Sequence, residues 1–161
     1  KPTIKLEGAM LRGYRTITVA GVRDPLLIAK LDGIERQVGE AVAANLAGVI
    51  EPSDYALRFL RYGLDAVTGP RCEDEQGQPS EVGLVIEAIA PTQELADTVL
   101  RLARSTALHQ HFEGRKTTAG NLAFPFSPSD IRCGAVYEFV VYHLMEPSPA
   151  DRLFPVRYQE V

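Results

Sequence analysis

Tryptophan is absent from this 161-residue chain, and cysteine and methionine occur only twice each. Cys72 and Cys133 lie far apart and in no C-x-x-C pattern, which argues against a disulfide scaffold and against a zinc site. No apolar run approaches the length of a membrane span, and no signal peptide is visible. These absences predict a cytoplasmic protein with reduced thiols, no metal, no cofactor and no membrane partner.

Net charge and chain length further restrict the partners and the number of domains that we expect. The formal net charge is -4 and the isoelectric point is about 5.4, whereas nucleic-acid partners favour a basic surface. We therefore expect no nucleic-acid partner. A hydrophobic fraction of 45% over residues 1–161 is typical of a single globular domain. Because the chain starts at Lys1 and runs straight into a strand-like segment, we expect it to be a processed, truncated or excised piece of something longer, although removal of a tag would leave the same start.

Five segments have the alternating or continuous apolar pattern of β-strands. Their bounds are 3–7, 14–22, 55–62, 82–90 and 136–145. A short link containing Gly13 joins the first two as a hairpin or as one bent strand. The segment 82–90 is apolar at nearly every position, which is typical of a central strand.

Two segments predict amphipathic helices. The first starts at Asp24-Pro25 and stops at Gly48. Its apolar stripe consists of Leu27, Leu31, Ile34, Val38 and Val42. The second is capped by Thr92 and stops by Gly114. Its buried stripe is predicted to be Leu95, Val99, Leu102 and Ala103.

The element order predicts an α+β fold of the ferredoxin-like, split βαβ type. We expect an antiparallel sheet with both helices on one face and an extra N-terminal strand at 3–7. The segment 82–90 is too apolar for one of its faces to be exposed to water, as shown by Val82, Val85, Ile86 and Ile89. The other face should therefore be covered by another domain or subunit, and we expect a homo-oligomer. Residues 63–80 predict an exposed loop, and residues 146–161 an extended tail.

The loop 115–131 is the most unusual segment. Its Gly120-Asn121 pair permits a sharp turn, and its prolines stiffen the chain, so a ligand would find it already ordered. The candidate ligand-binding residues are Arg115, Lys116, Asn121, Phe124, Phe126, Ser127 and Asp130. The two cations suit a carboxylate or phosphate. Alternatively, the phenylalanines close the sheet edge and the polar residues only form turns.

No other group forms a self-sufficient active site. His109, His111 and His143 lack metal-ligand spacing, and the acidic run 73–75 lacks the EF-hand pattern. Nucleotide-binding, nucleophile-elbow and zinc-protease motifs are missing. Catalytic residues are therefore not predicted.

Seven segments together resemble one known family. They are Ile4-Lys5-Leu6-Glu7-Gly8-Ala9, Gly13-Tyr14-Arg15-Thr16-Ile17, Ala20-Gly21-Val22-Arg23-Asp24-Pro25, Ala103-Arg104-Ser105-Thr106, residues 119–130, Val136-Tyr137-Glu138-Phe139 and His143-Leu144-Met145-Glu146. The chain is similar to the C-terminal region of acyclic terpene utilisation A family proteins, and residues 119–130 are the most specific part.

The resemblance implies an auxiliary domain of a catabolic protein whose main catalytic domain lies outside this chain. It implies a small acidic or acyl-CoA type ligand, held at a site that the loop 115–131 shares with that missing domain or with a partner subunit. Two alternatives stay open. One is an oligomerisation module without ligand contact, and the other is a small-molecule sensing domain.

Overall fold

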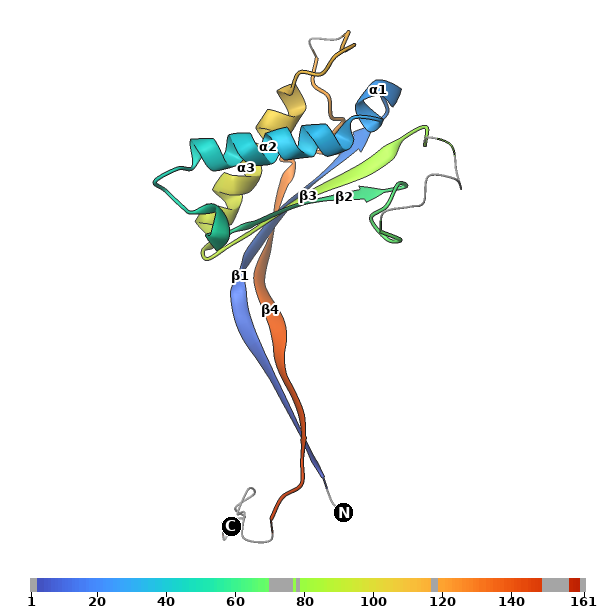
Figure 1. The fold of residues 1–161 in the computed structure, drawn as a ribbon. Coiled ribbons are helices and arrows are strands. Elements are labelled where there is room, and N and C mark those ends of the chain that lie inside the picture. The colour runs from blue at the N-terminus through green and yellow to red at the C-terminus, as the bar shows by residue number, and fades with distance from the viewer. Residues whose placement is uncertain (1–2, 70–76, 78, 117–118, 149–156, 160–161) are drawn as a thin grey trace. The chain divides into compact units, whose positions relative to one another are not determined.

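The computed structural model describes residues 3–69, 77, 79–116, 119–148 and 157–159. Its elements are β1 (Ile4–Val22), α1 (Pro25–Ile28), α2 (Leu31–Asn45), a 3-10 turn (Pro52–Asp54), β2 (Ala56–Tyr62), β3 (Val82–Ala90), α3 (Gln93–His109) and β4 (Asp130–Met145). The strands form an antiparallel sheet in the order β2-β3-β1-β4 (Figure 1). This order confirms the predicted ferredoxin-like arrangement.

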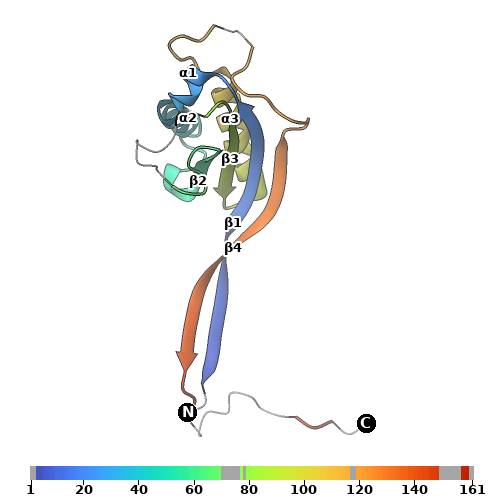
Figure 2. The ribbon, with the colours of Figure 1, turned by 90° about the vertical axis from the view of Figure 1, so that its right-hand side faces the viewer.

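Both long helices cover the same face of the sheet (Figure 2). Alternate residues of β1 and β3 point into this layer and are buried: Thr16, Thr18, Ala20, Val22, Val82, Leu84, Ile86, Ala88 and Ala90. From α2, Leu31, Ile34, Val38 and Val42 complete the core, as the apolar stripe predicted. The remaining alternate positions of β1 and β3 form the open face of the sheet, which is the face that the helices leave uncovered.

The buried stripe of α3 differs from the prediction at two positions. Leu95 and Leu102 are only partly buried, while Leu100 is fully buried. The other buried residues of α3 are Ala96, Val99, Ala103 and Ala107. The three alanines let α3 approach the sheet closely, so the helix turns its small residues inward and its larger leucines partly outward.

The predicted first helix is divided into two. Asp24 caps α1 through hydrogen bonds from the N–H groups of Leu26 and Leu27. The helix then ends because Lys30 bonds to the carbonyl of Leu27 in a tighter turn, and Lys30 itself has ψ near 7°. A new helix starts at Leu31. The apolar residues keep their helical spacing of three and four positions across this turn, which is why the sequence pattern alone predicted one helix.

The first two strand segments form the predicted bent strand and not the alternative hairpin. Residues 4–7 and 14–22 belong to one strand, and Gly13 between them has φ of +144°. A Cβ atom there would lie 2.4 Å from the carbonyl oxygen of Ala90, so glycine is required. β4 starts at Asp130 instead of 136, and its first residues contact α3: Asp130 pairs with Arg104 and Arg132 with Asp97.

The structure divides into two compact units. The main unit is Arg12–Val136, and the terminal unit combines Lys1–Leu11 with Tyr137–Val161. Most of the predicted tail 146–161 and part of the predicted loop 63–80, with its acidic run, lie outside the described residues. Across the described chain, no helix has the length and apolar character needed to cross a membrane.

Candidate functional site

The loop that follows α3 is tied to the end of that helix by Asn121. The Asn121 Nδ2 donates hydrogen bonds to the carbonyl oxygens of Ala107 at 3.0 Å and Gln110 at 2.8 Å. Its backbone N–H donates to Leu108 at 2.8 Å. Because the last carbonyl groups of a helix have no partner within the helix, Asn121 acts as a C-terminal cap for α3. A side chain predicted to contact ligand thus has a structural role.

Two further contacts hold the same part of the loop. A Cβ atom on Gly120 would lie 2.0 Å from Cδ1 of Leu108, so a larger residue would have to displace that side chain. Ala123 forms an isolated antiparallel bridge with Gly21 of β1, with N···O distances of 2.7 and 2.9 Å. The loop therefore lies against both α3 and the end of β1.

The far end of the loop is held through Arg104 of α3. Its Nε lies 2.6 Å from Oδ1 of Asp130, and its guanidinium lies 5.8 Å from the centre of the Phe124 ring. Both contacts are within the ranges for an ion pair and a cation–π interaction. Thr18 also donates a hydrogen bond to the carbonyl oxygen of Ser129 at 2.9 Å. These contacts explain why β4 starts earlier than the apolar pattern predicted.

The other predicted ligand residues divide into two groups. Arg115 donates to the carbonyl oxygens of His109 at 3.1 Å and Ala119 at 3.2 Å, so its guanidinium is oriented by the backbone. Lys116, Phe126 and Ser127 are exposed. The structure therefore brings Phe124 and Asp130 together and places Arg115 and Asn121 at the end of α3. Ligand contact by these residues stays a prediction.

A cavity of about 420 Å³ lies beside this loop. It is lined by the end of β1, the start of β3 and residues 120–123. The charged residues on its wall are Arg23, Asp24 and Glu81. The Asp24 carboxylate already accepts a hydrogen bond from Leu26 at 2.8 Å, since it caps α1. Arg23 is the cation on this wall, and it suits an anionic group.

The carboxylate of Asp97, which accepts hydrogen bonds from three side chains, was not predicted. Thr16 donates to its Oδ1 at 2.5 Å, Gln93 donates to the same atom at 3.1 Å, and Arg132 donates to Oδ2 at 2.8 Å. Burial raises the pKa of Asp97, but these hydrogen bonds outweigh burial and hold the pKa below its usual value. The cluster ties α3 to β1 and β4. Only the spacing of four between Gln93 and Asp97 signals it in the sequence.

A second unpredicted cluster surrounds Arg61 on β2. Asp32 and Asp65 form short ion pairs with this guanidinium, and Glu35 lies 3.9 Å from its Nε. Burial raises the pKa of Glu35 to about 7, because Arg61 compensates only partly and the two aspartates add repulsion. A cavity of about 370 Å³ lies beside Arg61. Burial is therefore the main reason why Glu35 keeps its proton to a higher pH than a free glutamate, and the two neighbouring aspartates add to the effect.

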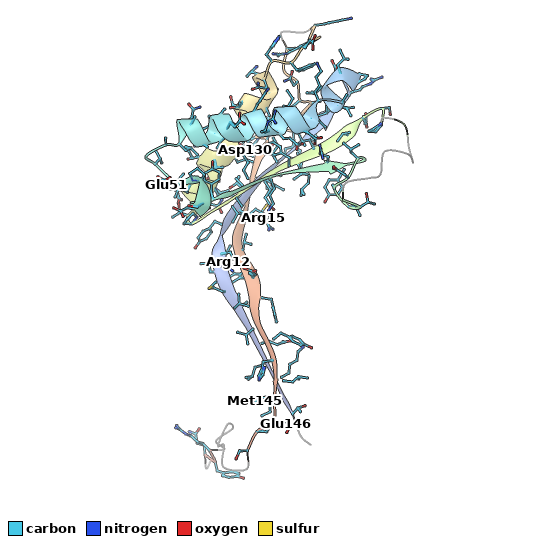
Figure 3. All side chains as sticks on the ribbon, viewed as in Figure 1. Arg12, Arg15, Glu51, Asp130, Met145 and Glu146 are labelled. Carbon is cyan, nitrogen blue, oxygen red and sulfur yellow. The ribbon has the colours of Figure 1, made fainter. Side chains whose placement is uncertain are left out.

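The open face of the sheet carries a third charged group. Glu87 lies in the centre of β3 and is only 8% exposed. Arg15 of β1 lies 2.7 Å from one carboxylate oxygen, and Arg58 of β2 lies 3.6 Å from the other. Figure 3 shows Arg15 on the side of the sheet away from α2. Two cations therefore neutralise one buried carboxylate within an apolar surface.

Metal ligands and histidines add no further site. Within the described part of the chain, no three His, Cys, Asp or Glu residues gather as a metal site would require. His109, His111 and His143 are all exposed. Cys133 is an exposed free thiol.

Comparisons with known proteins find no match to this chain among family models, curated proteins or solved structures.

Proposed function

We propose that this chain is an auxiliary domain of a larger catabolic protein of the acyclic terpene utilisation type. In this proposal the open face of the sheet docks onto the N-terminal domain of that protein or onto a partner subunit. The reaction is carried by residues outside this chain. The observation that supports docking is the composition of the open face.

Apolar side chains from three strands cover this face. In one row Val19, Val85 and Leu60 are cross-strand neighbours. On the same face, Ile17 precedes Val19 by two positions on β1, and Ile89 follows Glu87 by two positions on β3. All five side chains are half-buried. Each is too apolar for a fully wet surface, so a partner that covers them removes further apolar area from water.

The charged centre of the face specifies the partner chemistry. Glu87 lies between Arg15 and Arg58, so the three side chains together carry one net positive charge. The Arg58 side chain is 62% exposed. A complementary partner surface is therefore apolar with a single carboxylate near its centre, because an unpaired cation would be costly to cover.

The docking proposal is tested with Val85→Lys and the matched variant Val49→Lys. Val49 is 65% exposed in the turn after α2, so it controls for the added charge. The measurement is the affinity of this chain for the remainder of the longer protein. We expect Val85→Lys to weaken binding at least tenfold and Val49→Lys less than threefold. Equal weakening by both variants, or a wild-type chain that does not bind, would contradict the proposal.

A second function is favoured by the cavity beside the loop. Arg23 lines this cavity and Lys116 is an exposed cation on the same loop, so a small acidic or acyl-CoA type ligand suits the site. Asn121→Ala is a poor test, since loss of the helix cap costs about 1 kcal/mol of stability on its own.

Arg23→Ala and Lys116→Ala are better tests, because both side chains are exposed. If the site is shared with the missing domain, both variants will raise KM for an acidic substrate of the longer protein at least threefold while kcat and the melting temperature stay unchanged. Unchanged KM values would show that the loop is structural only.

A further inference from the structure

The terminal unit contains a two-stranded antiparallel sheet, here called the terminal strand pair. It consists of residues 4–11 of β1 and 137–145 of β4. β3 pairs with β1 only over Tyr14–Val22, so within the described chain residues 4–11 have β4 as their strand neighbour. An isolated pair of strands is marginally stable in water, and its faces need to be covered.

Two contacts assign the faces of the terminal strand pair. A Cβ atom built on Gly8 would lie 3.3 Å from the Cβ of Val141, so these two residues share one face. The ammonium group of Lys5 lies 4.8 Å from the centre of the Tyr142 ring, so these two share the opposite face. Because side chains alternate along a strand, each contact fixes the orientation of every second residue.

The face that holds Gly8 and Val141, here called the apolar face, is almost free of polar groups. Its side chains are Ile4, Leu6, Met10, Tyr137, Phe139, Val141, His143 and Met145, and His143 near one end is the single ionisable group other than tyrosine. Tyr137 is 66% exposed and Phe139 is 60% exposed. The charges of Lys5, Glu7 and Glu138 all lie on the opposite face by the same alternation. The opposite face also exposes Leu11, Val140, Tyr142 and Leu144, so the two faces differ in charge and not in the presence of exposed apolar side chains.

We infer that the apolar face binds the apolar face of a second copy of this chain. A two-fold dimer requires a surface that complements itself, and an uncharged apolar face meets that requirement without opposing like charges. In such a dimer the sheets stack face to face, and the charged faces stay in water.

The area of the apolar face is sufficient for a dimer. Two aromatic side chains exposed by 66% and 60%, together with Leu6, Met10 and Val141 exposed by 39–44%, amount to roughly 500 Å² per copy. Two copies would then bury at most about 1,000 Å², which is the lower limit for a specific interface. Aromatic residues such as Tyr137 and Phe139 are also of the type that dominates binding energy at such interfaces.

The test compares Phe139→Lys with Val140→Lys. The two residues are neighbours with exposed fractions of 60% and 47%, but they lie on opposite faces. Sedimentation equilibrium of the 161-residue chain measures the dissociation constant of the dimer. We expect the wild type to have twice the monomer mass of 17.6 kDa at micromolar concentration. Phe139→Lys should raise the dissociation constant at least tenfold, and Val140→Lys less than threefold.

Further outcomes separate this inference from a general effect on folding and from docking at the open face. Both variants should melt within about 2 °C of the wild-type monomer, because exposed positions contribute little to stability. Val85→Lys should leave the dimer intact. A wild-type chain that is monomeric at every concentration, equal weakening by both variants, or a dimer that only Val85→Lys dissociates would each overturn the inference.

Discussion

The main unit and the terminal strand pair contain similar strands but differ in what covers them. In β3, Val82, Leu84 and Ile86 are at most 2% exposed, because α2 and α3 lie on that face. In the terminal strand pair, Tyr137 and Phe139 are at least 60% exposed. An apolar pattern therefore identifies a strand, but the covering layer comes from helices in the main unit and, in the proposed dimer, from a second copy at the terminal strand pair.

The largest difference between the two regions should appear with Leu100→Ala. Leu100 is fully buried between α3 and the sheet. Removing its side chain leaves a cavity in addition to the lost transfer free energy, so we expect the free energy of unfolding to fall by about 3 kcal/mol. Urea denaturation measures this change.

Leu144→Ala is the matched substitution in the terminal strand pair. Leu144 is 59% exposed and lies on the face with Tyr142, which stays in water in the proposed dimer. We expect a change within about 0.5 kcal/mol. A loss comparable to that of Leu100→Ala would show that the opposite face is covered as well, and the contrast between the two regions would fail.

An effect smaller than that of Leu100→Ala distinguishes the regions through ionisation, because burial in the main unit raises the pKa of Glu35. Its folded pKa of about 7 lies above its ordinary value of 4.5. The folded state therefore keeps a proton that the unfolded state has lost between these two pH values. The free energy of unfolding should fall as pH rises through this window, with the full contribution present below it. Glu35→Gln should remove this loss and stabilise the protein at pH 8 by on the order of 2 kcal/mol.

The control for Glu35→Gln is Glu40→Gln on the same helix, where the side chain is 70% exposed. This variant shows how the loss of an exposed negative charge alone changes the free energy of unfolding. Urea denaturation of all three proteins at pH 5 and pH 8 gives the comparison. Equal pH dependence of the wild type and Glu35→Gln would mean that Glu35 is ionised in the folded state.

The fold could be predicted because its signals are local. The bounds of β3 match the predicted strand 82–90, and Thr92 caps α3 through a hydrogen bond from Leu95 at 3.2 Å. The turn at Lys30 was missed, since the stripe continues across it. The inward face of α3 was partly missed because alanines, which carry little hydrophobic signal, form much of it.

The site was harder to predict because its contacts join residues far apart in the chain. Asp97 binds Thr16, which is 81 positions away, and Glu87 binds Arg15 across paired strands. No short motif marks such pairs. The loop 115–131 was noticed for its composition, but the composition did not reveal that Asn121 caps a helix and that Asp130 pairs with Arg104. Those roles depend on how the end of α3 meets the sheet.

The neighbouring positions of the first and last strands have a practical consequence. β1 and β4 are adjacent and run in opposite directions (Figure 2), so the main unit begins at Arg12 and finishes at Val136 at the same end of two neighbouring strands. A module with adjacent entry and exit points can be grafted into a surface turn of an unrelated host without pulling that turn apart. Residues 12–136 are thus suited to insertion into another protein. Circular permutation would need only a short linker between these two positions.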